Sequence, residues 1–224
     1  MGIVKDIKSD GLDIDGVPHI YVSTYQDNGK RLSVVLRTSL PATQLEPQIR
    51  QEILGIDPGL RRTGFGLVRL ESGQQRWVGS GTIQTGEGST AERLAKIVEG
   101  IDQLIHSYQP DEAAVEEVFV NVNPRSTLLL GQARGAAIAA LALHKLPVHE
   151  YAAMQIKQSI AGHGRAAKAQ MQCMVQRLLS LEGSPTPDAA DALACALYHL
   201  QSRKLGALQA LAYGRGRLLA RKKR

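Results

Sequence analysis

The order of apolar and polar residues divides the chain into stretches with the period of strands and stretches with the period of helices. Five short apolar or alternating runs, bounded by Gly, Pro or polar residues, predict strands. They cover residues 53–57, 63–70, 76–85, 113–119 and 148–151. Five other stretches repeat apolar residues at three- and four-residue spacing and predict helices. They cover residues 89–108, 126–144, about 152–159, 166–181 and 187–202.

The order of these elements predicts the topology. The first three strands follow one another closely enough to pair antiparallel. The later strands alternate with helices, which requires parallel crossover connections. We therefore expect an α/β fold with a mixed five-stranded sheet flanked by helices.

The residues before position 53 have a different pattern. Residues 19–25 and 31–37 read as two strands around Asp27-Asn28-Gly29-Lys30, a strong hairpin signal, and Pro41 and Pro47 indicate a linker. We predict three segments: an N-terminal β-rich extension over 1–52, the main domain over 53–202, and a C-terminal tail over 203–224.

The excess of positive charge in the chain lies in that tail. Residues 203–224 hold eight of the 27 lysines and arginines and no acid. The remaining 202 residues carry 19 basic side chains against 21 acidic ones, a balance of −2. The tail therefore suits a polyanion such as nucleic acid, or it is a solvated, solubilising end.

Two cysteines, Cys173 and Cys195, exclude a disulfide framework and a four-cysteine zinc site. Both lie in helical apolar patterns, so we expect reduced, buried side chains in a cytoplasmic protein. No signal-peptide pattern opens the chain, and no uninterrupted apolar run is long enough for a membrane span, so we expect no membrane association.

Acidic residues stand in apolar surroundings on three separate elements. Asp57 ends the first strand of the main domain, and Glu116 follows the run Ala113-Ala114-Val115, nearer to it than Glu117. Asp188 and Asp191, at positions i and i+3, share one face of a helix. Individually, an Asp-Pro-Gly turn accounts for Asp57 and a helix N-cap accounts for Asp188. Neither explanation covers Asp191, one turn further into the helix.

Together these four carboxylates form a candidate metal site. If the strands ending at Asp57 and Glu116 are parallel neighbours, both acids lie at the same sheet edge, where the helix carrying Asp188 and Asp191 could cross. Oxygen ligands without a His or Cys cluster suit Mg²⁺ or Mn²⁺ rather than zinc. Such a cluster suits two-metal cleavage of a phosphodiester bond.

Seven blocks of the sequence resemble the RuvC family of bacterial Holliday-junction resolvases, in family order across about residues 53–200. A single Gly-Ile-Asp-x-Gly would be weak, because actin-like ATPases and sugar kinases begin similarly, but the ordered set is specific. The blocks are Ile53–Gly59, Thr63–Gly66, Val115–Phe119, Leu130–Gly135, Glu150–Ala152, Lys157–Gln158 and Asp188–Ala194.

The resemblance implies a ribonuclease-H-like fold and a cytoplasmic homodimer that makes paired symmetric nicks in four-way junction DNA. It implies work with the RuvA–RuvB branch-migration complex in recombination, repair and the SOS response. It also implies Mg²⁺ as cofactor, with two ions per subunit and Mn²⁺ as a substitute. The metal-binding catalytic carboxylates, by motif match, are Asp57, Glu116, Asp188 and Asp191.

Four further residues match family positions. Lys157 and Lys168 match basic positions that contact DNA or assist catalysis, and Phe119 matches an aromatic that stacks on junction bases. Arg134 either reaches phosphate or serves the dimer interface. Without the resemblance, the lysines would read as solvated surface charges and Phe119 as a core residue. The segment 1–52 and the long basic tail depart from the family pattern.

Two alternatives to a resolvase stay open. One is a non-catalytic junction-binding protein on the same scaffold, although retention of all four acids disfavours it because negative charge opposes DNA binding. The other is an actin-like ATPase, motivated by Asp57-Pro58-Gly59 and Gly64. The chain is short for the two lobes of such an enzyme, and no second phosphate-binding glycine loop is evident.

Overall fold

A computed structural model of the chain describes residues 20–22, 34–36, 51–71, 73–117 and 123–203. Two compact units are present, residues 1–46 and 47–224. In the first unit, strands β1 (Ile20–Val22) and β2 (Val34–Leu36) pair antiparallel, with Ile20 opposite Leu36. The two predicted strands therefore exist, while the turn between them lies outside the described residues.

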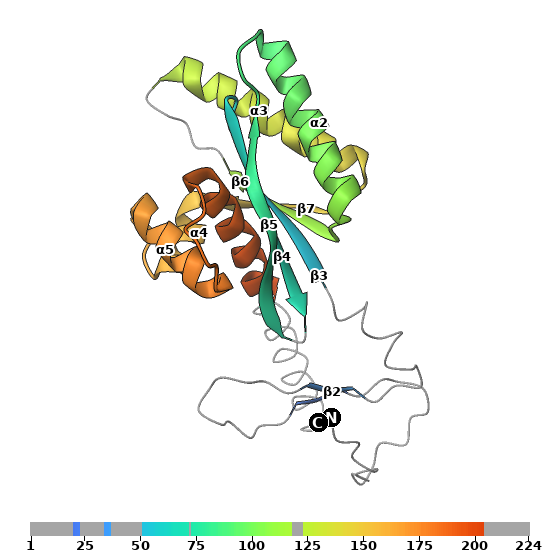
Figure 1. Cartoon of the computed structure of the whole chain (residues 1–224), viewed down its shortest axis with the longest axis vertical. Helices are drawn as coiled ribbons and strands as arrows, with labels where there is room; N and C mark the ends of the chain where they lie inside the picture. The colour runs from blue at the N-terminus through green and yellow to red at the C-terminus, as the bar shows by residue number, and fades with distance from the viewer. Residues whose placement is uncertain (1–19, 23–33, 37–50, 72, 118–122, 204–224) are drawn as a thin grey trace, which may run out of the picture. The chain divides into compact units, whose positions relative to one another are not determined.

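The second unit is built on a five-stranded mixed sheet with strand order β5-β4-β3-β6-β7 (Figure 1). Strands β3, β4 and β5 are antiparallel, whereas β6 runs parallel to both β3 and β7. This is the predicted topology. The strands are β3 (Gln51–Asp57), β4 (Arg62–Glu71), β5 (Gln74–Gln84), β6 (Glu112–Glu117) and β7 (Val148–Ala152).

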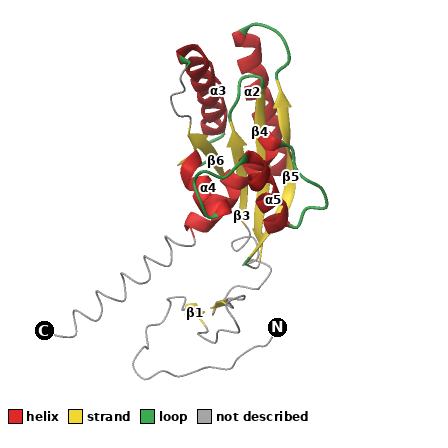
Figure 2. Ribbon diagram, turned by 90° about the vertical axis from the view of Figure 1, so that its left-hand side faces the viewer, coloured by secondary structure: helices red, strands yellow, loops and turns green. Residues whose placement is uncertain are grey.

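Helices cover both faces of the sheet, so the unit has three layers. Figure 2 shows α4 and α5 on one side of the strands, with α2 and α3 arranged together on the other. A fifth helix over residues 187–203, which we call the C-terminal helix, packs with α4 and α5. The labelled helices are α2 (Thr90–Tyr108), α3 (Pro124–Leu143), α4 (Ala153–Ala161) and α5 (Lys168–Leu179).

The alternation of side chains along the strands assigns each residue to one of two cores. Leu54, Ile56 and Val115 pack against α2 and α3. Ile53 and Ala114, on the opposite face, pack against α4, α5 and the C-terminal helix. Asp57 and Glu116 continue the second alternation, so they emerge on the face that the C-terminal helix covers.

Local sequence explains where the helices begin and end. Ser89 caps α2 in a capping box with Glu92, in which each side chain accepts from the other residue's backbone N–H. Asn123 caps α3 by accepting from two backbone N–H groups, with Pro124 in the first turn. Gly162 ends α4 in the left-handed conformation, with φ of 83°.

The structure corrects the prediction for one of the two cysteines. Cys195 is buried, but Cys173 is exposed on α5, so the prediction that both cysteines are buried was wrong. Its position in the helix points it to solvent between the buried Met171 and Val175. Among the described residues, α3 is long and apolar enough to cross a membrane by length and composition, although no single run of its residues is wholly apolar. Only about a fifth of its apolar window is buried.

Candidate functional site

The candidate site lies where the parallel strands β3 and β6 end. Ile56 on β3 is paired with Val115 on β6, so Asp57 and Glu116 each follow one residue later at the same edge. Glu117 projects to the opposite face. The structure therefore brings Glu116, and not Glu117, beside Asp57.

Side-chain hydrogen bonds hold the turn that follows Asp57. Buried Thr63 donates its hydroxyl to the Gly59 carbonyl at 2.9 Å and accepts from the Gly59 N–H at 3.3 Å. Thr85, also buried, donates to the Leu60 carbonyl at 2.7 Å. These bonds fix the loop that follows the first carboxylate.

The C-terminal helix packs closely on the sheet beside the site because three positions beneath it are glycines, which carry no side chain. A Cβ atom on Gly55 would lie 2.0 Å from the Ala192 carbonyl oxygen, and one on Gly64 2.0 Å from the Asp188 carbonyl oxygen. A Cβ atom on Gly66 would lie 2.6 Å from the Leu193 side chain.

Three glycines of β3 and β4 thus let backbone pack on backbone. Gly55 and Gly66 are register partners, and Gly64 is the partner of Asp57. Asp188, whose backbone lies against Gly64, is thereby placed next to Asp57. These glycines were missed as positioning residues, although glycine at alternate positions within a strand signals a close backbone approach.

The four carboxylates influence one another's ionisation. Burial raises the pKa of Asp57 to about 8, and the negative charges of Glu116, Asp191 and Asp188 add to it in that order. Burial likewise raises the pKa of Glu116 to about 7, and the negative charge of Asp191 is the second cause of that shift. Burial also raises the pKa of Asp191, and Asp188 adds to that shift. The surroundings of the cluster therefore disfavour the simultaneous ionisation of all four carboxylates.

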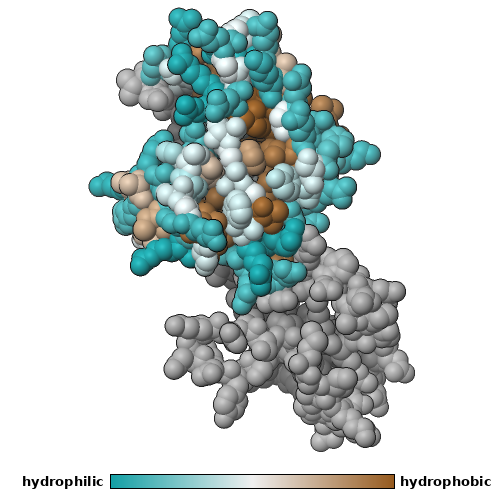
Figure 3. Space-filling view, viewed as in Figure 1, coloured by the Kyte–Doolittle hydropathy of each residue, from teal (hydrophilic) through white to brown (hydrophobic). Residues whose placement is uncertain are grey.

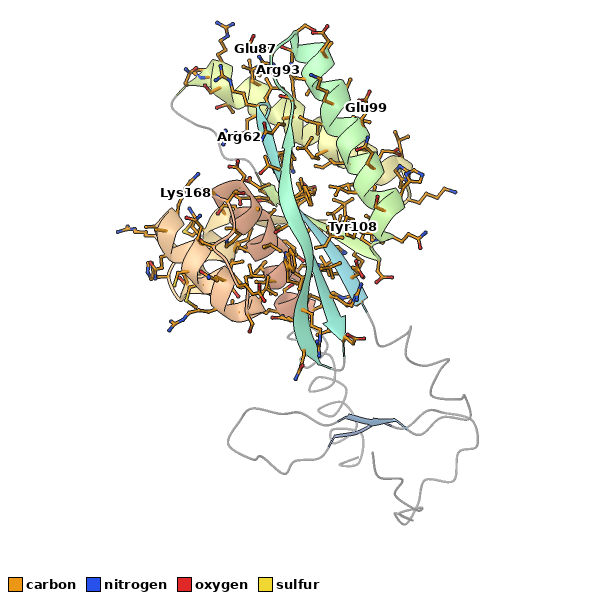
Figure 4. The ribbon with its side chains drawn as sticks, viewed as in Figure 1. Arg62, Glu87, Arg93, Glu99, Tyr108 and Lys168 are labelled. Atoms are coloured by element: carbon orange, nitrogen blue, oxygen red, sulfur yellow. The ribbon has the colours of Figure 1, made fainter. Side chains whose placement is uncertain are left out.

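Two lysines face the same cluster. Lys168, the first residue of α5, lowers the pKa values of Asp57, Glu116 and Asp191, and Lys157 of α4 lowers those of Glu116 and Asp191. Lys168 is exposed and extends from the beginning of α5 (Figure 4). No acidic residue in the first turn of α5 offsets this positive charge at a helix N-terminus, where the helix dipole disfavours it.

The four carboxylates are not drawn together as in a filled metal site. Among the described residues, three His, Cys, Asp or Glu side chains bring ligand atoms within 4.8 Å of one another in two places, and neither includes these acids.

The remaining predicted residues lie elsewhere or outside the described part. Arg134 on α3 forms an ion pair with Glu150 on β7, and its Nε is buried without a hydrogen-bond partner. This ion pair links α3 to β7, the strand next to β6. Phe119 lies outside the described residues.

The strand order, with acids at the ends of β3 and β6, defines the ribonuclease-H-like class of α/β proteins. The family model "Crossover junction endodeoxyribonuclease RuvC" matches residues 53–199. The RuvC of Thiobacillus denitrificans is 57% identical over 161 residues, covering 72% of this chain and 94% of the relative. That of Methylobacillus flagellatus is 60% identical over 153 residues, covering 66% and 85%.

Solved structures agree with these sequence matches. Thermus thermophilus RuvC is 34% identical, with a TM-score of 0.63 over 70% of this chain and 97% of that one. The same protein in complex with Holliday junction substrate gives a TM-score of 0.65. The chain belongs to the RuvC family.

Proposed function

We propose that this protein is a metal-dependent endonuclease that resolves four-way DNA junctions by paired symmetric nicks during recombination and repair. The observation that carries the proposal is the mutual electrostatic influence of four carboxylates and two lysines, gathered around the ends of β3 and β6, in a member of the RuvC family. A related RuvC is known in complex with Holliday junction substrate, which supports the choice of DNA.

The cluster fits Mg²⁺ by its donor chemistry. All four candidate ligands are carboxylates, and Asp57 and Glu116 have raised pKa values that a cation would lower. Mg²⁺ is usually held by one or two protein carboxylates, with water and substrate phosphate completing its octahedron. Asp57, Glu116, Asp188 and Asp191 would hold the metal; following the family resemblance we propose two ions per subunit, for which Mn²⁺ would substitute.

When bound, the metal supplies Lewis acidity that activates water and stabilises the leaving 3′ oxygen. The chain's own groups orient that chemistry. Asp57 and Glu116 come from strand ends fixed by the sheet, whereas Asp188 and Asp191 come from a helix packed backbone to backbone on the same sheet. This rigid support holds the ligand oxygens in position without loop motion.

The two lysines bind and neutralise phosphate in this proposal. Lys157 and Lys168 place positive charge beside the carboxylates, where the scissile phosphate would bring more negative charge. Either ammonium group can donate to a phosphate oxygen and offset the charge that grows in the transition state. For Phe119 we keep the proposal of stacking on junction bases. For Arg134, whose ion pair with Glu150 holds it at the junction of α3 and β7, we keep both proposals: contact with phosphate, or a place in the dimer interface.

We propose that a second copy of this chain covers α3. The helix is apolar yet mostly unburied, and Leu128 and Leu143 are 69% and 79% exposed. Apolar side chains left in water on one helix favour a protein interface. A two-fold dimer would present two active sites to the two equivalent strands of a junction. Sedimentation equilibrium should give a dimer, and Leu128→Glu should shift the distribution toward monomer.

The remaining proposals rest on the family and on charge. We propose a cytoplasmic enzyme that acts with RuvA–RuvB, and a nonspecific DNA anchor in the basic tail, residues 203–224. Deletion of the tail should flatten the salt dependence of DNA binding, because fewer counterions would be released. An unchanged slope would remove the anchor from the account.

Matched variants test the catalytic assignment. Asp57→Asn, Glu116→Gln, Asp188→Asn and Asp191→Asn should bind a labelled four-way junction as tightly as the wild type or more tightly, because each removes negative charge facing DNA. Cleavage should fall at least about 100-fold in each. Glu117→Gln is the control, because this neighbour of Glu116 faces away from the cluster. Cleavage retained in a cluster variant, or lost equally in Glu117→Gln, would contradict the assignment.

A further inference from the structure

A second cluster of metal-ligand side chains lies on the strand that carries Glu116, away from the nuclease site. Glu112 begins β6, and its Oε2 is 3.0 Å from His149 Nε2 and 2.9 Å from His199 Nε2. All three ligand atoms lie within 4.8 Å of one another. The two imidazole rings are tilted against each other with centroids 4.5 Å apart.

The cluster joins three elements: Glu112 from β6, His149 from β7 and His199 from the C-terminal helix. Glu112 precedes Glu116 by four residues, which is about 13 Å along a strand. His199 follows Asp191 by eight residues, which is about 12 Å along a helix. The cluster thus lies at the far end of the two elements that deliver catalytic carboxylates.

The donor set differs from that of the nuclease site. Two imidazoles and one carboxylate form a set typical of zinc, whereas four carboxylates suit magnesium. In a tetrahedral zinc site, bonds of 2.0–2.1 Å separate ligand atoms by about 3.3 Å. The separations of 2.9 and 3.0 Å between Glu112 Oε2 and the two imidazole nitrogens lie within a few tenths of an ångström of that value, and the ligand atoms of the two histidines lie within 4.8 Å of each other.

Hydrogen bonds around the cluster hold its ligands in place. His199 is fully buried, and its Nδ1 is 2.7 Å from the Tyr151 hydroxyl, which can accept from Nδ1–H once Nε2 binds a metal. Gln51 donates to Glu112 Oε1 at 3.0 Å, and Arg203 also pairs with Oε1. Oε2 is thereby left facing both imidazoles.

The cluster is accessible to solvent from one side. His149 is 42% exposed and Glu112 15% exposed, so an ion can enter past His149 and keep water as its fourth ligand. Arg203 opposes a cation, but its side chain is 47% exposed, so solvent screens its charge.

We propose that Glu112, His149 and His199 bind one Zn²⁺ ion, separate from the nuclease metals, which clamps the C-terminal helix to strands β6 and β7. Because the same helix carries Asp188 and Asp191, the clamp would stabilise the packing on which the nuclease site depends. Its role is structural, and zinc binding does not require that the protein cleave junctions.

Equilibrium dialysis of the metal-free full-length protein against Zn²⁺ tests the proposal, with Mg²⁺ in large excess to occupy the carboxylate cluster. The wild type should bind one more Zn²⁺ per chain than His149→Phe. Loss of an outer hydrogen-bond partner costs 10–100-fold in metal affinity, so loss of a ligand should cost at least about 100-fold. His149 is well exposed, so the variant should fold. Glu112→Gln should lose the same ion.

Thermal unfolding supplies an independent readout. Zn²⁺ at 100 times its dissociation constant should raise the wild-type Tm by about 5 °C or more and leave His149→Phe nearly unchanged. The control is His144→Phe. Among the described residues, His144 belongs to the other group of three potential metal ligands, together with Asp102 and His106. Equal zinc binding and equal Tm shifts in wild type and His149→Phe would overturn the proposal. Loss of the ion only in His144→Phe would also overturn it.

Discussion

Asp57→Asn should stabilise the metal-free protein while abolishing its cleavage. The Asp57 carboxyl has a pKa of about 8 in the folded protein against an ordinary 3.8, because it is buried and faces three other acids. Asn keeps the shape of the side chain and carries no charge. At neutral pH the buried Asp57 carboxyl must either stay protonated or ionise beside other negative charges, and both destabilise the folded protein. The substitution removes this free-energy cost.

The pH dependence follows from the direction of that shift. Well below pH 3.8, both the folded and the unfolded chain hold the Asp57 proton, so no stability is lost. At pH 4 the unfolded chain has released about half of that proton, which costs only about 0.6 kcal/mol. Between pH 4 and pH 8 the unfolded chain ionises first, and the wild-type free energy of unfolding falls. At pH 7 the full linkage amounts to about 4 kcal/mol, and solvent screening reduces it, so we expect about 2–4 kcal/mol.

Urea denaturation in EDTA measures this gain. With an m-value of about 2 kcal/mol/M, the Asp57→Asn midpoint at pH 7 should rise by about 1–2 M, and the difference should shrink to a few tenths of a molar at pH 4. Saturating Mg²⁺ should narrow or reverse the gap, because it binds the wild-type cluster. Glu117→Gln should change the midpoint little. A variant less stable than the wild type at pH 7, or a gap independent of pH, would refute the reasoning.

Three further predictions concern packing, metal binding and capping. Gly66→Ala should lower the free energy of unfolding by about 1–3 kcal/mol or more and reduce cleavage, because its Cβ would meet the C-terminal helix, whereas Gly183→Ala, in open space, should be neutral in urea denaturation. Mg²⁺ affinity, measured by calorimetry, should rise with pH up to about 8, because the metal displaces protons held by raised pKa values at Asp57 and Glu116, and a flat profile would contradict this. Ser89→Ala should cost about 1 kcal/mol in thermal unfolding through loss of the capping box, with unchanged cleavage, because α2 covers the opposite sheet face.

Local patterns in the sequence were enough to predict the elements of the main domain. Short apolar runs ended by Asp57-Pro58 and similar breaks correspond to strands, and the apolar spacing over residues 89–108 corresponds to α2. The parallel pairing of β3 and β6 followed from the helix between them, and it brought Asp57 beside Glu116.

What the sequence could not provide was the packing between distant elements. Gly55, Gly64 and Gly66 matter because one helix crosses them, and no local pattern says which helix will do so. The Glu112–His149–His199 cluster joins residues up to 87 positions apart, so no motif spacing reveals it. A histidine within the apolar run of the C-terminal helix was its one visible signal.

The exposure of side chains is a further feature that the sequence pattern does not predict. Apolar side chains are visible on the face that carries β5, ringed by hydrophilic ones (Figure 3). Trp77 on this edge strand is 48% exposed and donates to Ser80 at 3.1 Å. An alternating strand pattern predicts two faces but not which helices cover each face, so the exposure of Trp77 had to come from the structure.

Cleavage of a labelled synthetic four-way junction, with and without Mg²⁺, tests the central claim most directly. A linear duplex of matched sequence and the Asp57→Asn protein serve as controls. The account predicts paired, symmetric nicks on the junction that require Mg²⁺ and disappear in the variant. Tight junction binding without any nicks, or equal cutting of the linear duplex, would contradict it.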